Sequence, residues 1–173
     1  VRSGKIRYYG LSNFTGWQLT KAVHLAKAMN VAPPVTLQPQ YNLMHRAEYE
    51  QELAPLCADR GLGVLPWWGL ACGYLTGKYR VGAMSVQSQR AGFVEQYVNA
   101  EGERVLAVLD LIAADHGVAP AAVALSWLAA RPGVVAPLAS ARTPGQLAEL
   151  LPMAGLTLTA QEVARMDEAS VSV

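Results

Sequence analysis

Short apolar segments alternate with longer amphipathic segments along most of this chain. The short segments are residues 5–11, 35–38, 63–67 and 134–138, and their length and apolar character predict β-strands. Each is followed by a stretch with apolar residues at helical spacing. Strands that alternate with helices form parallel sheets joined by right-handed crossovers. The sequence therefore predicts an α/β fold with about four parallel strands.

The predicted helices carry recognisable boundary residues. Gly61 stands at a C-cap position, and Pro120 suits the first turn of a helix. Thr143 is an expected N-cap, and Thr159 with Glu162 forms a capping-box pattern. Helices are predicted over residues 15–30, 47–60, 101–116, 120–131 and 143–151, with a last one that opens at Thr159.

Two architectures fit this order of elements within a single domain, residues 1–173. One is a small doubly wound sheet. The other is half of an eight-stranded (β/α)8 barrel, which usually takes about 250 residues. In both, ligands bind at the carboxyl ends of the strands. Residues 68–99 lack clear periodicity, and a loop of this length in a compact domain is usually functional or mobile.

The composition excludes several classes of protein. With 52% apolar and 16% charged residues, the chain is typical of a packed globular protein, and a net charge of +1 argues against a nucleic-acid surface. No apolar run approaches the roughly 20 residues of a membrane span, and no secretion signal is visible. Cys57 and Cys72 form no CxxC pattern, so we expect reduced thiols in a cytoplasmic protein, with a structural disulfide as the weaker alternative.

Polar and aromatic side chains follow each predicted strand at its carboxyl end. Amide side chains both donate and accept hydrogen bonds, a flat aromatic ring stacks on another ring, and an arginine beside free N–H groups suits a phosphate. Together these groups predict a site for a dinucleotide such as a nicotinamide cofactor. The residues are Ser12, Asn13, Gln38, Trp67, Ser140 and Arg142.

Each of these residues also has a structural alternative. Asn13 is equally suited to cap the following helix, and Gln38 to satisfy backbone groups in a buried turn. Trp67 is an ordinary core residue by composition, and Arg142 an ordinary surface cation. The binding-site interpretation depends on their equivalent places in successive units. Other motifs are missing: the glycines form no GxGxxG, the histidines have no metal-ligand spacing and no GxSxG occurs.

Four sequence stretches, in this order, resemble the C-terminal half of an aldo-keto reductase family protein. They are KIRYYGLSNF, LQPQYNL, GVLPWWGLACGYLTGKYR and SARTPGQLAELL, and the resemblance extends from Lys5 to the end of the chain. Members of this family fold as (β/α)8 TIM barrels and reduce aldehydes and ketones with NADPH, without a metal. The resemblance thus implies an NADP-dependent oxidoreductase that acts on a small carbonyl substrate.

The resemblance also implies a role for particular residues. Ser12, Asn13 and Gln38 match the residues that hydrogen-bond the nicotinamide carboxamide, and Trp67 matches the aromatic that stacks on the nicotinamide ring. The remaining matches are to the pyrophosphate loop (Leu70, Gly73 and Leu75), to contacts with the 2'-phosphate and adenine (Ser140, Arg142 and Gln146) and to the adenine amino group (Glu149).

The chain departs from the family pattern in two respects. Several positions in the cofactor-binding segments differ: Trp68 and Gly69 stand where the family usually has Ser-Pro, and Cys72, Ser140 and Leu150 replace frequent small or amide residues. More importantly, the catalytic Asp, Tyr, Lys and His of the family all precede the Ser-Asn strand, and only eleven residues precede Ser12 here. We therefore assign no catalytic residue.

Two functions remain open from the sequence. The first is the cofactor-binding half of an NADPH-dependent reductase, inactive alone and completed by a missing N-terminal half. The second is a non-catalytic half-barrel that binds a nucleotide or a partner, such as a second copy. In either case we expect two open sheet edges and an unfilled barrel interior.

Overall fold

The computed structural model describes residues 1–80 and 91–171, which contain a parallel three-stranded sheet. The strands are β1 (Gly10–Ser12), β2 (Thr36–Gln38) and β3 (Gly63–Val64), in the order β1-β2-β3. This parallel order confirms the predicted α/β class. The strands are shorter than predicted. In the first, residues 1–8 are exposed and have no neighbouring strand, so the ladder begins only at Gly10.

The fourth predicted strand, residues 134–138, does not form a strand in the structure. It runs beside β3, where the N–H of Val135 donates to the carbonyl of Val64 over 2.9 Å, but only an isolated parallel bridge results. Pro66 and Pro137 have no N–H, so neither side can continue a regular ladder. The four strands expected of a half-barrel are thus reduced to three and a bridge.

The first two helices follow the first two strands. Helix α1 (Gly16–Ala28) begins at the N-cap Thr15, which forms a capping box with Gln18. The helix predicted over residues 47–60 contains a π-helical turn, η1 (Tyr49–Leu53), which continues into α2 (Ala54–Arg60). Pro55 explains the wide turn, because it lacks the N–H that would bond to Gln51. Gly61 ends α2 with a φ of 64°, as predicted.

The second half of the chain is mostly helical. The predicted loop 68–99 holds three short helices, and its residues 81–90 lie outside the described part. The N-caps Thr143 and Thr159 are confirmed. The elements are η2 (Ala71–Thr76), α3 (Ala91–Val94), η3 (Glu95–Tyr97), α4 (Ala100–His116), α5 (Pro120–Ala129), α6 (Pro144–Leu150), η4 (Leu151–Ala154) and α7 (Ala160–Ala169).

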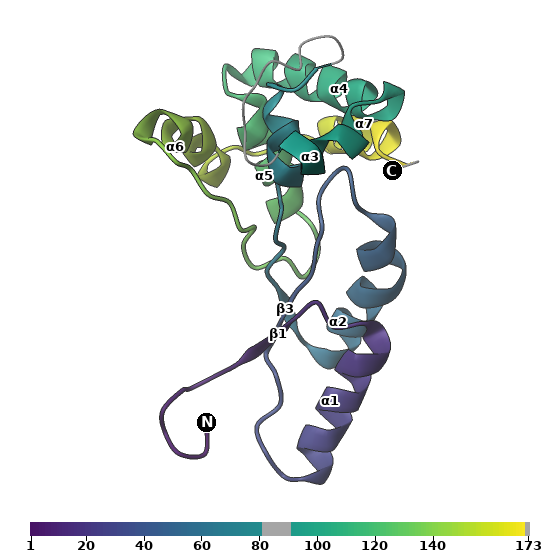
Figure 1. Cartoon of the computed structure of the whole chain (residues 1–173), viewed down its shortest axis with the longest axis vertical. Helices are drawn as coiled ribbons and strands as arrows, with labels where there is room; N and C mark the ends of the chain where they lie inside the picture. The colour runs from purple at the N-terminus through teal and green to yellow at the C-terminus, as the bar shows by residue number, and fades with distance from the viewer. Residues whose placement is uncertain (81–90, 172–173) are drawn as a thin grey trace.

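The elements form an elongated, open arrangement (Figure 1). Helices α1 and α2 lie along one side of the sheet, whereas α4, α5 and α7 form a layer beyond its carboxyl end, with α6 beside α5 at the edge of that layer. One hydrophobic core connects the sheet and its flanking helices to the layer of α4, α5 and α7. It includes Leu19, Leu37, Val64 and Trp127, all fully buried. No single helix among the described residues is long and apolar enough to span a membrane. Helices α4 and α5 taken together have the length and apolar composition of a span, but they are bent by 98° relative to each other.

The sheet is covered on one face only. Leu11, Leu37 and Val64 are paired in register and contact the core. Successive side chains of a strand point to opposite faces, so the strand residues next to these three face away from this core. A Cβ added at Gly63 would collide with Val135, which places Val135 on this second face, where its side chain is 68% exposed. One face of the sheet is therefore open among the described residues. Helices α1 and α2 lie on the same side of the sheet (Figure 1), as right-handed crossovers between consecutively paired parallel strands require. The arrangement is consistent with part of a (β/α) barrel.

Candidate functional site

A cavity of about 380 Å³ lies between the loop that follows β3 and the segment that contains α6. Its walls come from residues 68–78 and 138–150, which are far apart in the sequence. Six of the predicted site residues line it: Leu70, Gly73, Ser140, Arg142, Gln146 and Glu149. The departures from the family pattern at Trp68, Gly69, Cys72, Ser140 and Leu150 lie in the same walls.

The wall formed by residues 68–77 has an unusual backbone. Trp68, Ala71 and Cys72 adopt left-handed conformations with φ between 48° and 59°, and Gly73 follows with a φ of 99°. Non-glycine residues reach this region only at a cost in free energy, so the surrounding contacts must hold the loop in place. Leu75, also a predicted site residue, is fully buried in the core and lines neither cavity described here. Its side chain anchors the loop.

The wall formed by the α6 segment is tied together by its own side chains. The Thr143 hydroxyl accepts from the backbone N–H of Gln146 over 3.2 Å, as the N-cap of α6. The amide oxygen of Gln146 in turn accepts from the backbone N–H of Arg142 over 2.9 Å. The backbone at Arg142 is thereby fixed relative to α6, and the residue is exposed where it lines the cavity.

Lys78 and Thr76 also line the cavity and were missed from the sequence. The Lys78 ammonium lies 5.0 Å from the centroid of the Tyr79 ring, so the side chain is packed along the loop. The Gly-Lys pair in GYLTGKYR was the available sequence feature, but on its own it lacks the spacing of a phosphate-binding loop. With Arg142 on the opposite wall, two cations border one cavity, and such a pair suits a phosphate group.

The other predicted residues meet at the carboxyl ends of the strands. The Ser12 hydroxyl donates to the side-chain oxygen of Gln38 over 3.3 Å, and the two residues are paired in the sheet. The Trp67 indole N–H donates to the side-chain oxygen of Asn13 over 2.8 Å. Because Thr15 caps α1, the alternative role of Asn13 as N-cap is wrong.

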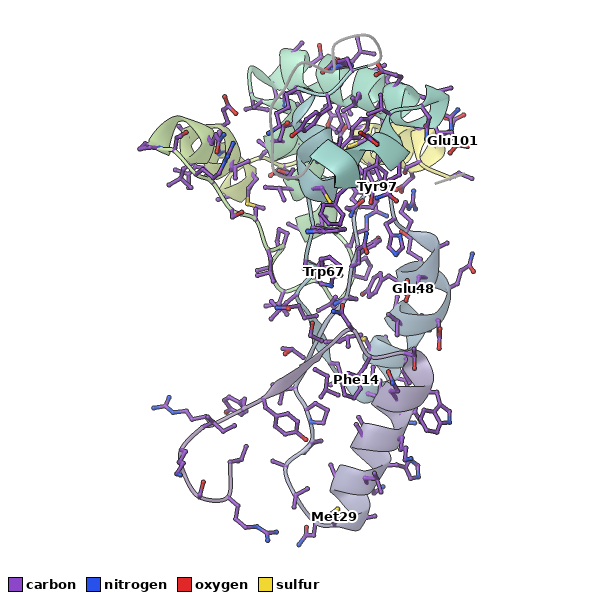
Figure 2. All side chains as sticks on the ribbon, viewed as in Figure 1. Phe14, Met29, Glu48, Trp67, Tyr97 and Glu101 are labelled. Carbon is purple, nitrogen blue, oxygen red and sulfur yellow. The ribbon has the colours of Figure 1, made fainter. Side chains whose placement is uncertain are left out.

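Asn13 and Trp67 line a second cavity of about 190 Å³, together with Phe14, Gln40 and Glu48 among others. Figure 2 shows Trp67 between the sheet and the upper helices, with Glu48 beside it at a similar height. Ser12 and Gln38 line neither cavity.

The two cavities are linked by adjacent tryptophans. Trp67 borders the smaller cavity and Trp68 the larger one. Their ring centroids are 4.7 Å apart at an interplanar angle of 63°, an edge-to-face arrangement. Trp67 is half-buried and is not part of the hydrophobic core, so its interpretation as a simple core residue is not supported.

Among the described residues, the charged side chains that line the cavities are Lys78, Arg142 and Glu149 in the larger one and Glu48 in the smaller one. No tyrosine or histidine lines either one in the part of the chain that the structure describes. Burial raises the pKa of Tyr74 to about 12, with a further contribution from Glu103, and it lies outside both cavity walls. The Nε2 of His45 lies 3.1 Å from a carboxylate oxygen of Glu48, and the Nε2 of His116 lies 2.7 Å from a carboxylate oxygen of Glu162. Within residues 1–80 and 91–171, no three potential metal ligands form a group.

Comparison with known proteins identifies the family. Residues 1–171 match the Aldo/keto reductase family model. The chain belongs to the aldo/keto reductase family. This aldo/keto reductase chain is 36% identical to the uncharacterized oxidoreductase YrpG of Bacillus subtilis, over 96% of its own length and 49% of the relative. It is 34% identical to protein tas of Escherichia coli, over 84% of its length and 42% of the relative.

A further relative is a probable voltage-gated potassium channel subunit beta of Oryza sativa subsp. japonica, 33% identical over 86% of this chain and 47% of the relative. The chain thus spans about half the length of the curated relatives that it matches. The family expected from the sequence is confirmed, whereas its assignment to the C-terminal half stays a prediction.

Proposed function

We propose that this chain is the cofactor-binding C-terminal half of an NADPH-dependent aldo-keto reductase and holds NADP(H) across the two linked cavities. One observation carries the proposal. Asn13, Trp67, Ser140 and Arg142 were selected from the sequence as dinucleotide contacts at three of the four predicted strand ends. They line two neighbouring cavities, with the adjacent residues Trp67 and Trp68 bordering one each. Local sequence alone does not predict that these residues lie close together, because the segments that carry them are brought together only by the fold.

At the proposed nicotinamide end, the hydrogen bond from Trp67 defines how Asn13 is presented. The indole N–H occupies the side-chain oxygen of Asn13, so the Asn13 NH₂ group is left to donate to a ligand carbonyl such as the carboxamide oxygen. Ser12 and Gln38 are bonded to each other beside it and supply further polar groups. The Trp67 indole provides a flat surface for a flat ring.

At the proposed phosphate end, Lys78 and Arg142 supply positive charge to the larger cavity. A guanidinium binds a phosphate through two parallel hydrogen bonds, so Arg142 favours a ligand with a 2'-phosphate, NADPH, over NADH. Glu149 lies in the same wall and is available to accept from the adenine amino group. A volume of about 380 Å³ suits one part of a dinucleotide, with the nicotinamide placed beyond it near Trp67.

When bound, the reduced nicotinamide supplies a hydride to a carbonyl carbon. The residues of this chain bind and orient the nucleotide. We assign the proton for the resulting alkoxide to the other half of the proposed barrel, because no tyrosine or histidine of the described residues lines the cavities. That half would also cover the open face of the sheet. The chain alone is expected to reduce no aldehyde or ketone.

The second candidate is a non-catalytic half-barrel that binds a nucleotide or a partner chain. The open sheet face favours it, because Val135 is 68% exposed and β1 has no neighbour on its outer side in the described sheet. For both candidates we propose a cytoplasmic protein that binds neither membrane nor nucleic acid. The two cysteines, free and buried, are compatible with a reducing compartment.

The decisive experiment is a titration of the chain with NADPH and with NADH, followed by quenching of tryptophan fluorescence. We expect saturable quenching by both, with tighter binding of NADPH. Arg142→Ala should weaken NADPH binding about tenfold and leave NADH binding nearly unchanged, because only NADPH carries the 2'-phosphate. Arg165→Ala, which removes an exposed arginine of α7 outside both cavities, is the matched control. Absence of saturable quenching at millimolar nucleotide would overturn the proposal.

A further inference from the structure

We propose that Asn42 is a positioning residue that holds the loop of residues 68–77, one wall of the larger cavity, in its binding conformation. Asn42 itself lines neither cavity. It lies in the turn after β2, whereas the loop follows β3. Its importance for nucleotide binding rests on the proposed function, but its effect on the loop does not.

Asn42 is fully buried, and both ends of its amide are used. The side-chain oxygen accepts from the backbone N–H of Met44 over 2.8 Å. The side-chain NH₂ donates to the carbonyl of Trp68 over 2.9 Å. Asn42 and His45 also bond to each other through their backbones, so the turn that carries the amide is closed. A buried side chain that must accept on one side and donate on the other fits an amide and not a carboxylate.

The carbonyl of Trp68 is the point at which this amide meets the loop. It also accepts from the backbone N–H of Ala71 over 2.7 Å, so two donors converge on one oxygen. The next loop bonds run from Gly73 and Leu75 to the carbonyl of Leu70. The carbonyl of Trp68 is thus held at the start of the segment in which Trp68, Ala71 and Cys72 are left-handed.

The left-handed residues explain why the loop needs an external partner. Their conformation is unfavourable for residues with a Cβ, and the loop's internal hydrogen bonds are short-range. Asn42 belongs to another βα unit, and its hydrogen bond fixes Trp68, the first of these left-handed residues. Because Trp68, Gly69, Leu70 and Gly73 line the cavity, a shift at Trp68 would move that wall.

The test removes the hydrogen-bond donor of the Asn42 side chain and keeps the size and shape of that side chain. Asn42→Asp keeps the acceptor for Met44 but places a carboxylate oxygen against the carbonyl of Trp68. Asn42→Ser removes the reach to Trp68 without adding charge, and it serves if the aspartate variant fails to fold. Asn99→Asp is the matched control, because Asn99 also donates from its amide to a backbone carbonyl and accepts from backbone N–H groups, at the N-cap of α4.

Three measurements on folded protein are compared. We expect Asn42→Asp to weaken NADP⁺ binding at least about tenfold. Without nucleotide, we expect a changed exciton circular-dichroism signal from the Trp67–Trp68 pair and faster amide exchange at Ala71 and Gly73. Asn99→Asp should change none of these.

A purely stabilising role would lower the melting temperature of the Asn42 variants but leave affinity, exciton signal and loop exchange as in the unmodified protein, and that result would overturn the inference. If the unmodified chain fails to bind NADP⁺, the proposed function is wrong. The exciton signal and the exchange rates, both measured without nucleotide, then still decide whether Asn42 positions the loop.

Discussion

The indole nitrogen of Trp67 lies 2.8 Å from the side-chain oxygen of Asn13, and the bond between them spans the end of the sheet. Asn13 follows β1 and Trp67 follows β3, with β2 between these strands. Neighbouring strands are about 4.8 Å apart, so the two side chains reach across the end of the middle strand. A φ of 56° at Asn13 turns its backbone out of the strand direction. The bond fixes both the indole and the amide before a ligand arrives.

Trp67→Phe tests this bond, because it keeps an aromatic ring and removes the N–H donor. We expect a several-fold loss of NADPH affinity, since the freed Asn13 amide loses its orientation. Affinity for 2'-phosphorylated ADP, which has no nicotinamide, should be unchanged because its contacts lie in the larger cavity. Both values can be measured by calorimetry, with Trp17→Phe on the exposed side of α1 as control. An equal loss for the two ligands would contradict the role given to Trp67.

Arg46 connects the second βα unit to α7 through an ion pair with Asp167 at 3.3 Å. The guanidinium makes two bonds to the Glu50 carboxylate, at 2.9 and 3.1 Å, and one to the Ser170 hydroxyl at 2.8 Å. Arg46→Ala would leave Glu50 without its cation in a half-buried site, so we expect a loss of about 2–4 kcal/mol in the free energy of unfolding. Arg60→Ala, which breaks the exposed pair with Asp59, should cost under about 1 kcal/mol. Denaturant unfolding measures both, and similar losses would contradict the prediction.

Glu162 makes stability depend on acid pH. The backbone N–H of Thr159 lowers the pKa of this carboxyl, with further contributions from the Thr159 hydroxyl and His116. The folded state therefore favours the carboxylate. This stabilisation is complete above the unfolded glutamate pKa of about 4.3 and is lost as the pH falls through the lower folded pKa.

We therefore expect Glu162→Gln to lower the free energy of unfolding by about 1 kcal/mol at pH 7, and the difference from the unmodified protein to shrink below about pH 4. Melting temperatures recorded across this range test it. Glu168→Gln, at an exposed position of the same helix, is the control and should give no such trend. A difference that does not change with pH would contradict the capping-box origin.

Cys57 makes stability depend on alkaline pH in the opposite sense. Burial raises the pKa of its thiol to about 11, so the folded chain keeps the proton after an unfolded cysteine, with a pKa of about 8.5, has lost it. Stability should therefore fall between these two values as the pH rises. Cys57→Ala should show a shallower fall in melting temperature between pH 8 and 10. At pH 8 we also expect slow alkylation of Cys57 in the native chain and rapid alkylation after denaturation, since the side chain is 2% exposed.

Local features of the fold were predictable because they depend on neighbouring residues. Gly61 ends α2 in a left-handed conformation, and Thr143 and Thr159 cap α6 and α7. Each depends on a hydrogen bond or a backbone preference within one turn, so a few consecutive residues are enough to predict it. The family was also accessible, because its motifs are contiguous stretches.

The lengths of the strands and the composition of the site were decided by the tertiary structure. Residues 134–138 have a strand-like sequence, yet pairing depends on a neighbour with free N–H groups, and prolines interrupt it on both sides. The sequence did not show that Lys78 faces the same cavity as Arg142, or that Asn13 bonds to Trp67 and not to α1. The sequence by itself determined the family and most of the longer helices with several of their caps, because family motifs and caps are contiguous stretches of the chain. Only the tertiary structure decided the single covered sheet face, the two neighbouring cavities and the partner of each amide, because these depend on which distant segments pack together.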